Sequence, residues 1–422
     1  MLIVNIGQLV TPRGTTALAG HAMRAIEIRA DAYVHIQDGV ILSVGAMSQA
    51  PHDKEVFDAQ GGVVIPGLVD PHTHAVFYGT REDEFLARCQ GEKYGKGILT
   101  SAEHVRRASL EQIYQFSKRF LLEMMRLGTT TVEIKSGYGL DTESELKLLR
   151  VIQRLREALT PATPPLSRLN GRGAGGEGLE IVPTFCGAHA VPAGVETSAY
   201  IREVIEEMLP RVQREHLAEF GDVFCERGFF GIDESREILR ACRAAGLELK
   251  IHADELSPLG GAELAAELRA VSADHLLHIS DNGIAAMREA GVVAVLLPGT
   301  AFSLHAPYAP ARKMIDAGLS VALGTDFNPG TCLIYSMFFM IALAVLKMRM
   351  TVEEALTAAT LNAAAALRRA HAIGSLEPGK RADLVVLDLE NYRQIPYFMG
   401  HEGRFVRAVI SGGRVAYERA SA

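Results

Sequence analysis

The feature that most constrains the fold is an alternation of short apolar runs with helical patterns between residues 63 and 324. Helical patterns at 110–127 and 143–159 are examples of the segments that separate these runs. Strands that alternate with helices favour a parallel sheet, and eight of them predict a (β/α)8 barrel, the TIM-barrel form of the α/β class. The eight predicted strands are 63–69, 129–134, 179–185, 222–225, 248–251, 272–275, 292–297 and 320–324.

Both ends of the chain contain strand-like runs without helices between them. Near the start, Asp38-Gly39 separates two apolar stretches and is typical of a hairpin turn. Similar runs lie between residues 382 and 415. We therefore expect the two ends to meet as one small β domain beside the barrel. The predicted division is residues 1–62 with 371–422 for the β domain, and residues 63–370 for the barrel.

Composition and charge narrow the classes of function. With 48% hydrophobic residues in 422 positions, the chain can bury a large core. The net charge is −7 without a basic stripe, so we expect no nucleic-acid partner. The five cysteines are scattered and form no CxxC pair, which favours a reducing compartment, the cytoplasm. The apolar segment 332–346 is shorter than the roughly 20 residues that span a membrane, so we expect a buried helix and no membrane partner.

Histidine and carboxylate side chains lie at the carboxyl ends of the predicted strands, where barrel enzymes carry their chemistry. The first strand runs into VIPGLVDPHTH, which ends in His72 and His74. Because side chains alternate along a strand, these two imidazoles point to the same side. His252 follows the fifth strand and Asp326 follows the eighth. Three nitrogens and one carboxylate oxygen suit zinc or a similar divalent metal, with one position open to water.

This combination, together with PGLVDPHTH, resembles the amidohydrolase superfamily, whose members join a metal-bearing barrel to a β-sandwich built from both termini. The resemblance therefore implies a smaller β-sandwich domain here. In several families of the superfamily, a carboxylated lysine at the fourth strand bridges two metals. Here that strand ends in Cys225-Glu226 and offers no lysine. We expect one divalent or trivalent metal ion per chain, and the ligands accept zinc, iron or manganese.

Six motifs, in the expected order, resemble the imidazolonepropionase family of this superfamily: PHTHAVFYGTREDEF, IKSGYGL, FCGAHAVP, KIHADEL, SADHLLHIS and ALGTDFNPGT. The resemblance implies hydrolysis of the cyclic amide C–N bond of 4-imidazolone-5-propanoate to N-formimidoyl-L-glutamate, a step of L-histidine degradation. It also implies a homodimer. Two alternatives stay open: a deaminase that acts on a related heterocyclic base, and a barrel without catalysis that serves as a scaffold.

Three residues are candidates for the chemical step: Glu255, His275 and Asp326. Glu255 lies three residues beyond His252, so its carboxylate can take a proton from the attacking water and deliver it to the leaving nitrogen. His275, at the end of the sixth strand, can form a hydrogen bond with the attacking water or with the developing oxyanion. The resemblance supports both roles, and Asp326 can share the proton transfer while it binds the metal.

The propionate of the implied substrate requires a cation, and Arg81, seven residues after His74, can hold it with two hydrogen bonds. Arg81 and the IKSGYGL stretch are the features that distinguish the resembled family from the deaminases.

Lys135 ends a strand but has no evident second set of ligands to serve, so we assign it no role. The Pro/Gly-rich loop 161–178 carries no evident chemistry. The other predicted substrate-binding residues are Tyr94, Tyr138, His189, Glu255, Asn328, Gly330 and Thr331.

Overall fold

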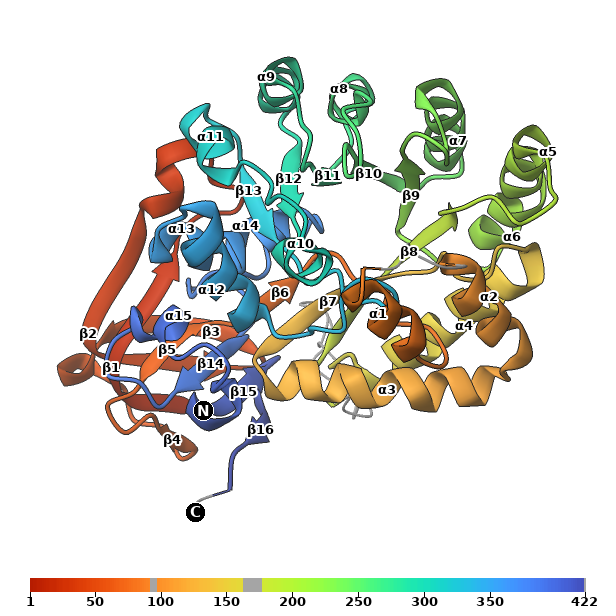
Figure 1. Ribbon diagram of the computed structural model, residues 1–422. Coiled ribbons are helices and arrows are strands. Elements are labelled where there is room, and N and C mark those ends of the chain that lie inside the picture. The colour runs from red at the N-terminus through yellow and green to blue at the C-terminus, as the bar shows by residue number, and fades with distance from the viewer. Residues whose placement is uncertain (92–96, 162–176, 421–422) are drawn as a thin grey trace.

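The computed structural model describes residues 1–91, 97–161 and 177–420 of the chain. These residues form two eight-stranded sheets, one curved into a barrel and the other built from both ends of the chain (Figure 1). In the second sheet the blue strands from the end of the sequence are joined to the red strands from its start through the orange strand at residues 63–66. The predicted barrel with a smaller β unit from both termini is confirmed.

Eight parallel strands form the barrel, and their order around it follows the chain from β6 to β13. The two edge strands are joined just beyond their carboxyl ends, where the His74 amide donates to the Phe327 carbonyl at 2.9 Å and the Asp326 amide donates to the His72 carbonyl at 3.0 Å. The segments that close the barrel therefore carry three of the four predicted metal ligands, His72, His74 and Asp326. The strands are β6 (Leu68–Asp70), β7 (Thr129–Lys135), β8 (Glu180–Ala188), β9 (Phe220–Cys225), β10 (Glu248–Ala253), β11 (Ser272–His275), β12 (Val293–Leu296) and β13 (Val321–Leu323).

The prediction of one strand over residues 63–69 is wrong. This run is divided into β5 (Val63–Pro66), which pairs with strands of the terminal sheet, and β6, which opens the barrel. Gly67 separates the two strands, and a side chain at this position would collide with Thr130. An apolar run that is buried on both faces gives no sign that it passes from one sheet to another. The other seven predicted strands agree with the structure to within three residues at each end.

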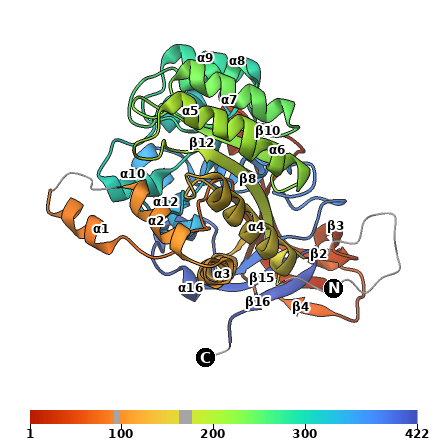
Figure 2. The same ribbon diagram turned by 90° about the vertical axis from the view of Figure 1, so that its right-hand side faces the viewer.

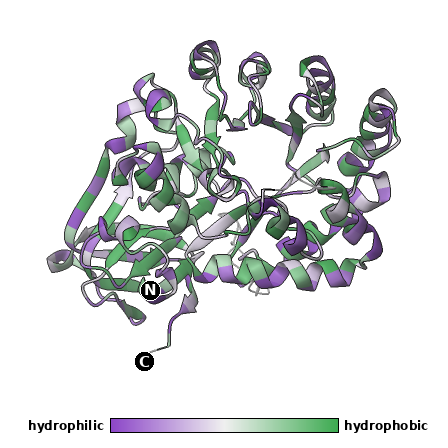
Figure 3. Cartoon of the chain, in the orientation of Figure 1, coloured by the Kyte–Doolittle hydropathy of each residue, from purple (hydrophilic) through white to green (hydrophobic). Residues whose placement is uncertain are grey.

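Helices cover the outside of the barrel, and their starts follow from the sequence. Ser109 precedes α3, where its hydroxyl and the Gln112 side chain form a capping box. Figures 1 and 2 both place α7, α8 and α9 on the side of the barrel away from the terminal sheet. Figure 3 shows that these outer helices mix hydrophilic and hydrophobic residues, while the strands of the terminal sheet are largely hydrophobic.

The α-helices are α1 (Glu82–Cys89), α2 (Ile98–Arg107), α3 (Leu110–Arg126), α4 (Thr142–Leu159), α5 (Thr197–Arg202), α6 (Leu209–Arg214), α7 (Ile232–Ala244), α8 (Gly261–Glu267), α9 (Asp281–Ala290), α10 (Pro298–Leu304), α11 (Ala311–Asp316), α12 (Met337–Met348), α13 (Val352–Ala358), α14 (Leu361–Ala365), α15 (Gln394–Tyr397) and α16 (Glu402–Phe405). Shorter turns are η1 (Gly20–Arg24), η2 (Met47–Gln49) and the π-helical η3 (Glu203–Met208).

The apolar segment 332–346 contributes a buried helix, as the sequence predicts. Helix α12 begins after Ser336, whose hydroxyl accepts a hydrogen bond from the Phe339 amide at 3.2 Å. Eight of its side chains are buried, including Phe338 and Ile341. Within the described parts of the chain, no helix combines the length and the apolar character needed to cross a membrane.

The terminal sheet has the order β16-β15-β14-β5-β1-β2-β3, with β4 paired to β1. The predicted hairpin is confirmed: Asp38 and Gly39 have φ values of 51° and 77°, as a tight turn between β2 and β3 requires. The division of the chain into two domains stays a prediction. The strands are β1 (Leu2–Pro12), β2 (Ile26–Gln37), β3 (Val40–Ala46), β4 (Val56–Asp58), β5, β14 (Leu384–Leu387), β15 (Val406–Ser411) and β16 (Arg414–Glu418).

An ion pair joins the barrel to the terminal sheet. Arg381, which precedes β14, donates to Glu180 of β8 at 2.5 Å and to Asp383 at 2.7 Å. All three side chains are at most 12% exposed. We expect Arg381→Met to lower the free energy of unfolding by about 3–5 kcal/mol, because it leaves the buried Asp383 without a cation and Glu180 with Arg369 alone, 3.2 Å away. Urea denaturation followed by circular dichroism measures this loss.

The matched control for this prediction is Arg368→Met. Arg368 pairs with Glu248 at 3.3 Å, but both side chains are more than half exposed. An exposed pair contributes about 1 kcal/mol or less. Equal losses for the two variants would show that burial does not set the strength of the Arg381 contact.

Candidate functional site

The histidine motif after β6 is held in place by a buried carboxylate. Asp70, the last residue of β6, accepts hydrogen bonds from the Thr325 hydroxyl at 2.6 Å, from the Thr325 amide at 3.0 Å and from the His72 amide at 3.4 Å. Asp70 is fully buried. It therefore fastens the segment that carries His72 and His74 to the segment that carries Asp326.

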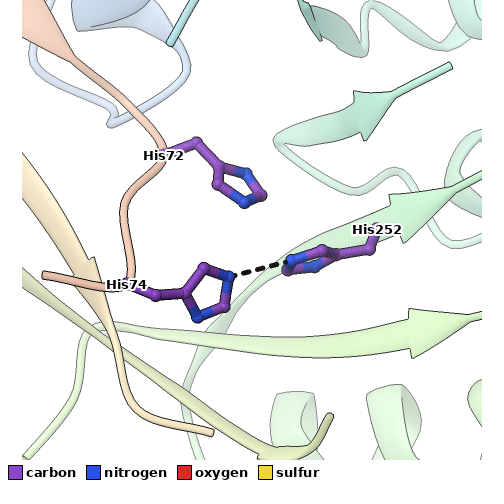
Figure 4. Close-up of side chains that lie close together, drawn as sticks. All are labelled: His72, His74 and His252. Carbon is purple, nitrogen blue, oxygen red and sulfur yellow. Dashed lines mark hydrogen bonds between the residues drawn. The ribbon is translucent and has the colours of Figure 1, made fainter. Parts of the chain in front are cut away.

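Three buried imidazoles converge at the carboxyl end of the barrel. His72, His74 and His252 point toward one another from the end of β6 and from β10 (Figure 4). The Nε2 atoms of His74 and His252 are 3.3 Å apart, and Nε2 of His72 is buried without a hydrogen-bond partner. Ligand atoms of these three residues lie within 4.8 Å of one another. The sequence predicted that these residues would meet, and the structure brings them together.

A contact at the outer nitrogen of each imidazole, Nδ1, fixes the orientation of the ring and therefore the direction in which the inner nitrogen, Nε2, points. Nδ1 of His72 bonds Asp274 at 2.6 Å, and Nδ1 of His252 bonds Asp222 at 3.1 Å. Nδ1 of His74 lies 3.4 Å from the Ser136 carbonyl, which can only accept. With Nδ1 as the donor, each Nε2 presents a lone pair to the centre.

Lone pairs directed at one point fit a shared cation. When Nδ1 is the donor in both rings, the Nε2 atoms of His74 and His252 face each other as acceptors 3.3 Å apart, and this geometry fits two ligands of one ion. Burial also holds the pKa values of His72 and His74 well below their ordinary range, which keeps them neutral. The donor set therefore fits a divalent metal.

Asp326, the fourth predicted ligand, lies beside the imidazoles and forms a second group of possible ligands with His72 and His275. Its Oδ1 lies 3.6 Å from Nε2 of His72 and 4.0 Å from Nε2 of His74, while Oδ2 accepts from the Thr300 hydroxyl at 2.6 Å. Asp326 and His275 have φ values of 49° and 76°, which place both in the left-handed region that residues other than glycine rarely adopt. The surrounding structure thus holds both side chains in unusual backbone geometry, a feature that clusters at functional sites.

Glu255 and His275, two of the predicted catalytic residues, face each other beside this cluster. Nδ1 of His275 lies 3.5 Å from Oε1 of Glu255. Burial raises the pKa of Glu255 to about 8, and the charge of Asp326 adds to this effect. A carboxyl group with such a pKa can both take up and release a proton near neutral pH.

One cavity of about 360 Å³ opens onto these residues. Most of the predicted binding residues line it: Arg81, Tyr138, His189, Glu255, Asn328, Gly330 and Thr331. One wall of the cavity is apolar and was not predicted from the sequence; it consists of Ile98, Phe224, Phe229, Leu256 and Leu304. Nothing in the sequence distinguishes these side chains from ordinary core residues. The predicted Tyr94 lies outside the described residues, as does most of the Pro/Gly-rich loop.

Arg81 lies at the edge of this cavity and is buried. Its Nη2 donates to Glu84 at 2.5 Å, and the Thr100 hydroxyl donates to the other oxygen of Glu84 at 2.8 Å. Arg81 is therefore not part of a surface salt bridge.

Two aromatic residues and one loop define other parts of the cavity. His189 stacks on His74 with ring centroids 4.7 Å apart, and Tyr138 lies 5.6 Å from both rings. The Asn328 side chain accepts from the amides of Gly330 and Thr331 and donates to the Asp326 carbonyl at 2.7 Å. Asn328 thereby ties the predicted substrate loop to a predicted metal ligand.

The carboxylates that bond the outer nitrogens of His72 and His252 were not predicted from the sequence. Asp222 and Asp274 lie within strands that were predicted correctly, and they contact Lys135, which had been set aside. A carboxylate inside an otherwise apolar strand was the available signal. Cys186 lies close to Asp222 and His252, but the Lys135 ammonium is 2.7 Å from Asp222 and repels a cation there.

Known proteins share the sequence or the fold of this chain over nearly its whole length. The imidazolonepropionase of Geobacillus thermodenitrificans is 47% identical over 425 residues, which cover 97% of this chain and 96% of that protein. The imidazolonepropionase of Thermoanaerobacter pseudethanolicus is 44% identical over 408 residues, covering 95% and 94%. The solved structure of guanine deaminase from E. coli has a TM-score of 0.73 at 16% identity over 99% of both chains, which shows the fold alone. The sequence model of the amidohydrolase family matches residues 63–416. This chain belongs to the amidohydrolase family.

Proposed function

We propose that this protein hydrolyses the cyclic amide C–N bond of 4-imidazolone-5-propanoate to give N-formimidoyl-L-glutamate, a step of L-histidine degradation. Near-identical length and 44–47% identity to proteins named imidazolonepropionase support this function. The observation that carries it is a single cavity lined by His74, His252 and Asp326 on one part and by the buried Arg81 on another. Such a cavity suits a small planar ring that bears a carboxylate.

We propose that His72, His74, His252 and Asp326 hold one metal ion, zinc or iron. When bound, the metal supplies an acidified water and polarises the ring carbonyl. A single ion is favoured because the fourth strand provides no bridging lysine. Glu226, which follows that strand, accepts hydrogen bonds from Ser257 and from the Leu256 amide, so it is already engaged elsewhere.

Different residues of the chain then carry out the separate parts of the chemical step. Glu255 takes a proton from the attacking water and delivers it to the ring nitrogen that leaves. His275 donates a hydrogen bond to the oxygen that gains negative charge. Asp326 assists the proton transfer, and Thr300 holds its carboxylate through the 2.6 Å hydrogen bond. The apolar wall around Phe224 excludes water from the side of the ring.

Arg81 holds the propionate in this proposal, and Arg81→Lys is expected to raise KM about tenfold or more with a smaller change in kcat. The reason is that lysine keeps the charge but loses the two parallel N–H donors. Steady-state kinetics on the imidazolone substrate measure both constants. The control is Arg107→Lys, an arginine of α2 that is 79% exposed and does not line the cavity. An unchanged KM for Arg81→Lys would argue against contact with the substrate.

Turnover of fresh 4-imidazolone-5-propanoate by the purified protein tests the function. Loss of the ring absorbance should accompany formation of N-formimidoyl-L-glutamate, and metal analysis of the same sample should give about one ion per chain. No turnover by the metal-loaded protein would contradict the substrate. Ammonia release from a heterocyclic base would instead favour a deaminase, the alternative that the related fold keeps in view.

We further propose that the protein is a cytoplasmic homodimer with one substrate-sized cavity per chain, and that residues 1–62 with 371–422 form one domain and residues 63–370 the other. The scattered cysteines support the reducing compartment. The separate terminal sheet supports the domain division. Light scattering on the purified protein measures the mass in solution, and a monomer would contradict the dimer.

A further inference from the structure

A group of buried charges lies directly behind the imidazoles, and we call it the ionic cluster. It consists of Glu133, Lys135, Asp222, Lys250 and Asp274, all of whose side chains are 0% exposed. These residues come from four different barrel strands, β7, β9, β10 and β11. Burial of five charged groups is costly unless each is paired, so the cluster requires a reason beyond packing.

Lys135 is the centre of the cluster. Its Nζ lies 2.8 Å from Glu133, 2.7 Å from Asp222 and 3.7 Å from Asp274. Asp222 bonds the outer nitrogen of His252, and Asp274 bonds the outer nitrogen of His72. One ammonium group therefore contacts both carboxylates that orient imidazoles of the predicted metal centre.

We propose that Lys135 is a positioning residue for the metal centre: its ammonium holds Asp222 and Asp274 in place, so that His252 and His72 direct Nε2 at the ion. Without a cation between them, two buried carboxylates repel each other and would move apart. Each imidazole would then lose the acceptor that fixes its ring. This inference rests on the proposed metal centre and is independent of the substrate.

The competing explanation is that Lys135 only stabilises the fold. Lys250 separates the two explanations, because it is equally buried but is placed differently. It donates to the backbone carbonyls of Pro71 at 3.0 Å and Ala366 at 3.4 Å, and it approaches Asp274 only to 3.9 Å. Loss of Lys250 removes a buried charge from the same layer, yet it leaves the contact between Lys135 and the two carboxylates intact.

The experiment compares Lys135→Met with Lys250→Met in the full-length protein. Zinc affinity is measured by competition with a chromophoric chelator, and ligand geometry is measured from the visible absorption of the Co²⁺ form. We expect Lys135→Met to bind zinc about 10- to 100-fold more weakly, with an altered Co²⁺ spectrum, as when an orienting partner of a metal ligand is lost. Lys250→Met should bind zinc within about threefold of the wild type, even if it unfolds at a similarly reduced temperature.

Two results would overturn the proposal. One is wild-type zinc affinity and an unchanged Co²⁺ spectrum in Lys135→Met, and the other is an equal loss of affinity in both variants. If Lys135→Met does not fold, Lys135→Gln repeats the test with a side chain that can still donate to the carboxylates. If neither folds, Glu133→Gln frees Lys135 for Asp222 and Asp274, and an affinity below that of the wild type would overturn the proposal. None of these readouts needs turnover, so an inactive wild type that binds zinc would count against the proposed function alone.

Discussion

Replacing Glu255 with glutamine is expected to lower kcat by about 10²- to 10⁴-fold and to leave the metal content unchanged. The amide keeps the size of the carboxyl group but can neither take a proton from water nor give one to the leaving nitrogen. Glu255 lies 3.5 Å from His275 and contributes to none of the groups of side chains that could hold the ion. This variant should therefore lose turnover while it keeps the metal ion.

Single-turnover kinetics and metal analysis on the same preparation test this expectation. Glu263→Gln is the matched control, since Glu263 lies on α8 after the same strand but does not line the cavity. It should retain wild-type turnover. If Glu255→Gln keeps most of its activity, the proton transfer belongs to another group, and Asp326 is the next candidate. If it loses the ion, Glu255 supports the metal centre rather than the chemical step.

The barrel could be predicted because its parallel strands are continuous apolar runs separated by helical patterns. The same property explains the one failure. Residues 63–66 pair with the terminal sheet and residues 68–70 pair with the barrel, yet both halves are equally apolar. Residues far away in the sequence determine which strand a buried strand pairs with. The apolar pattern of the buried strand itself does not predict that partner.

The candidate ligands could be proposed from the sequence because each lies at or just beyond a strand end, where barrel enzymes carry their chemistry. Asp222 and Asp274 were missed because they lie one layer deeper, among apolar neighbours on the same strands. Lys135 was given no role because the sequence shows no second set of metal ligands, but its carboxylate partners come from β9 and β11 and only folding brings them together. Side chains of the cavity wall such as Phe224 show no pattern distinct from the core.

Replacing His72 with alanine is expected to remove the metal and the activity together. His72 contributes one of the three inward nitrogens, and its Nε2 lies 3.6 Å from Asp326, so its loss leaves an incomplete ligand set. It also leaves Asp274 buried without the imidazole that it bonds at 2.6 Å. Metal content after dialysis should fall from about one ion per chain to near zero, and turnover should fall with it.

The control for this variant is His305→Ala, since His305 is exposed, follows α10 and does not line the cavity. It should keep both the ion and the activity. Circular dichroism must show that His72→Ala is folded, because a buried residue is removed. A folded His72→Ala protein that turns over substrate at the wild-type rate without metal would disprove the ligand set. A folded variant that loses the ion while His305→Ala keeps it would place the metal at the carboxyl end of the barrel, where β6 and β13 are joined.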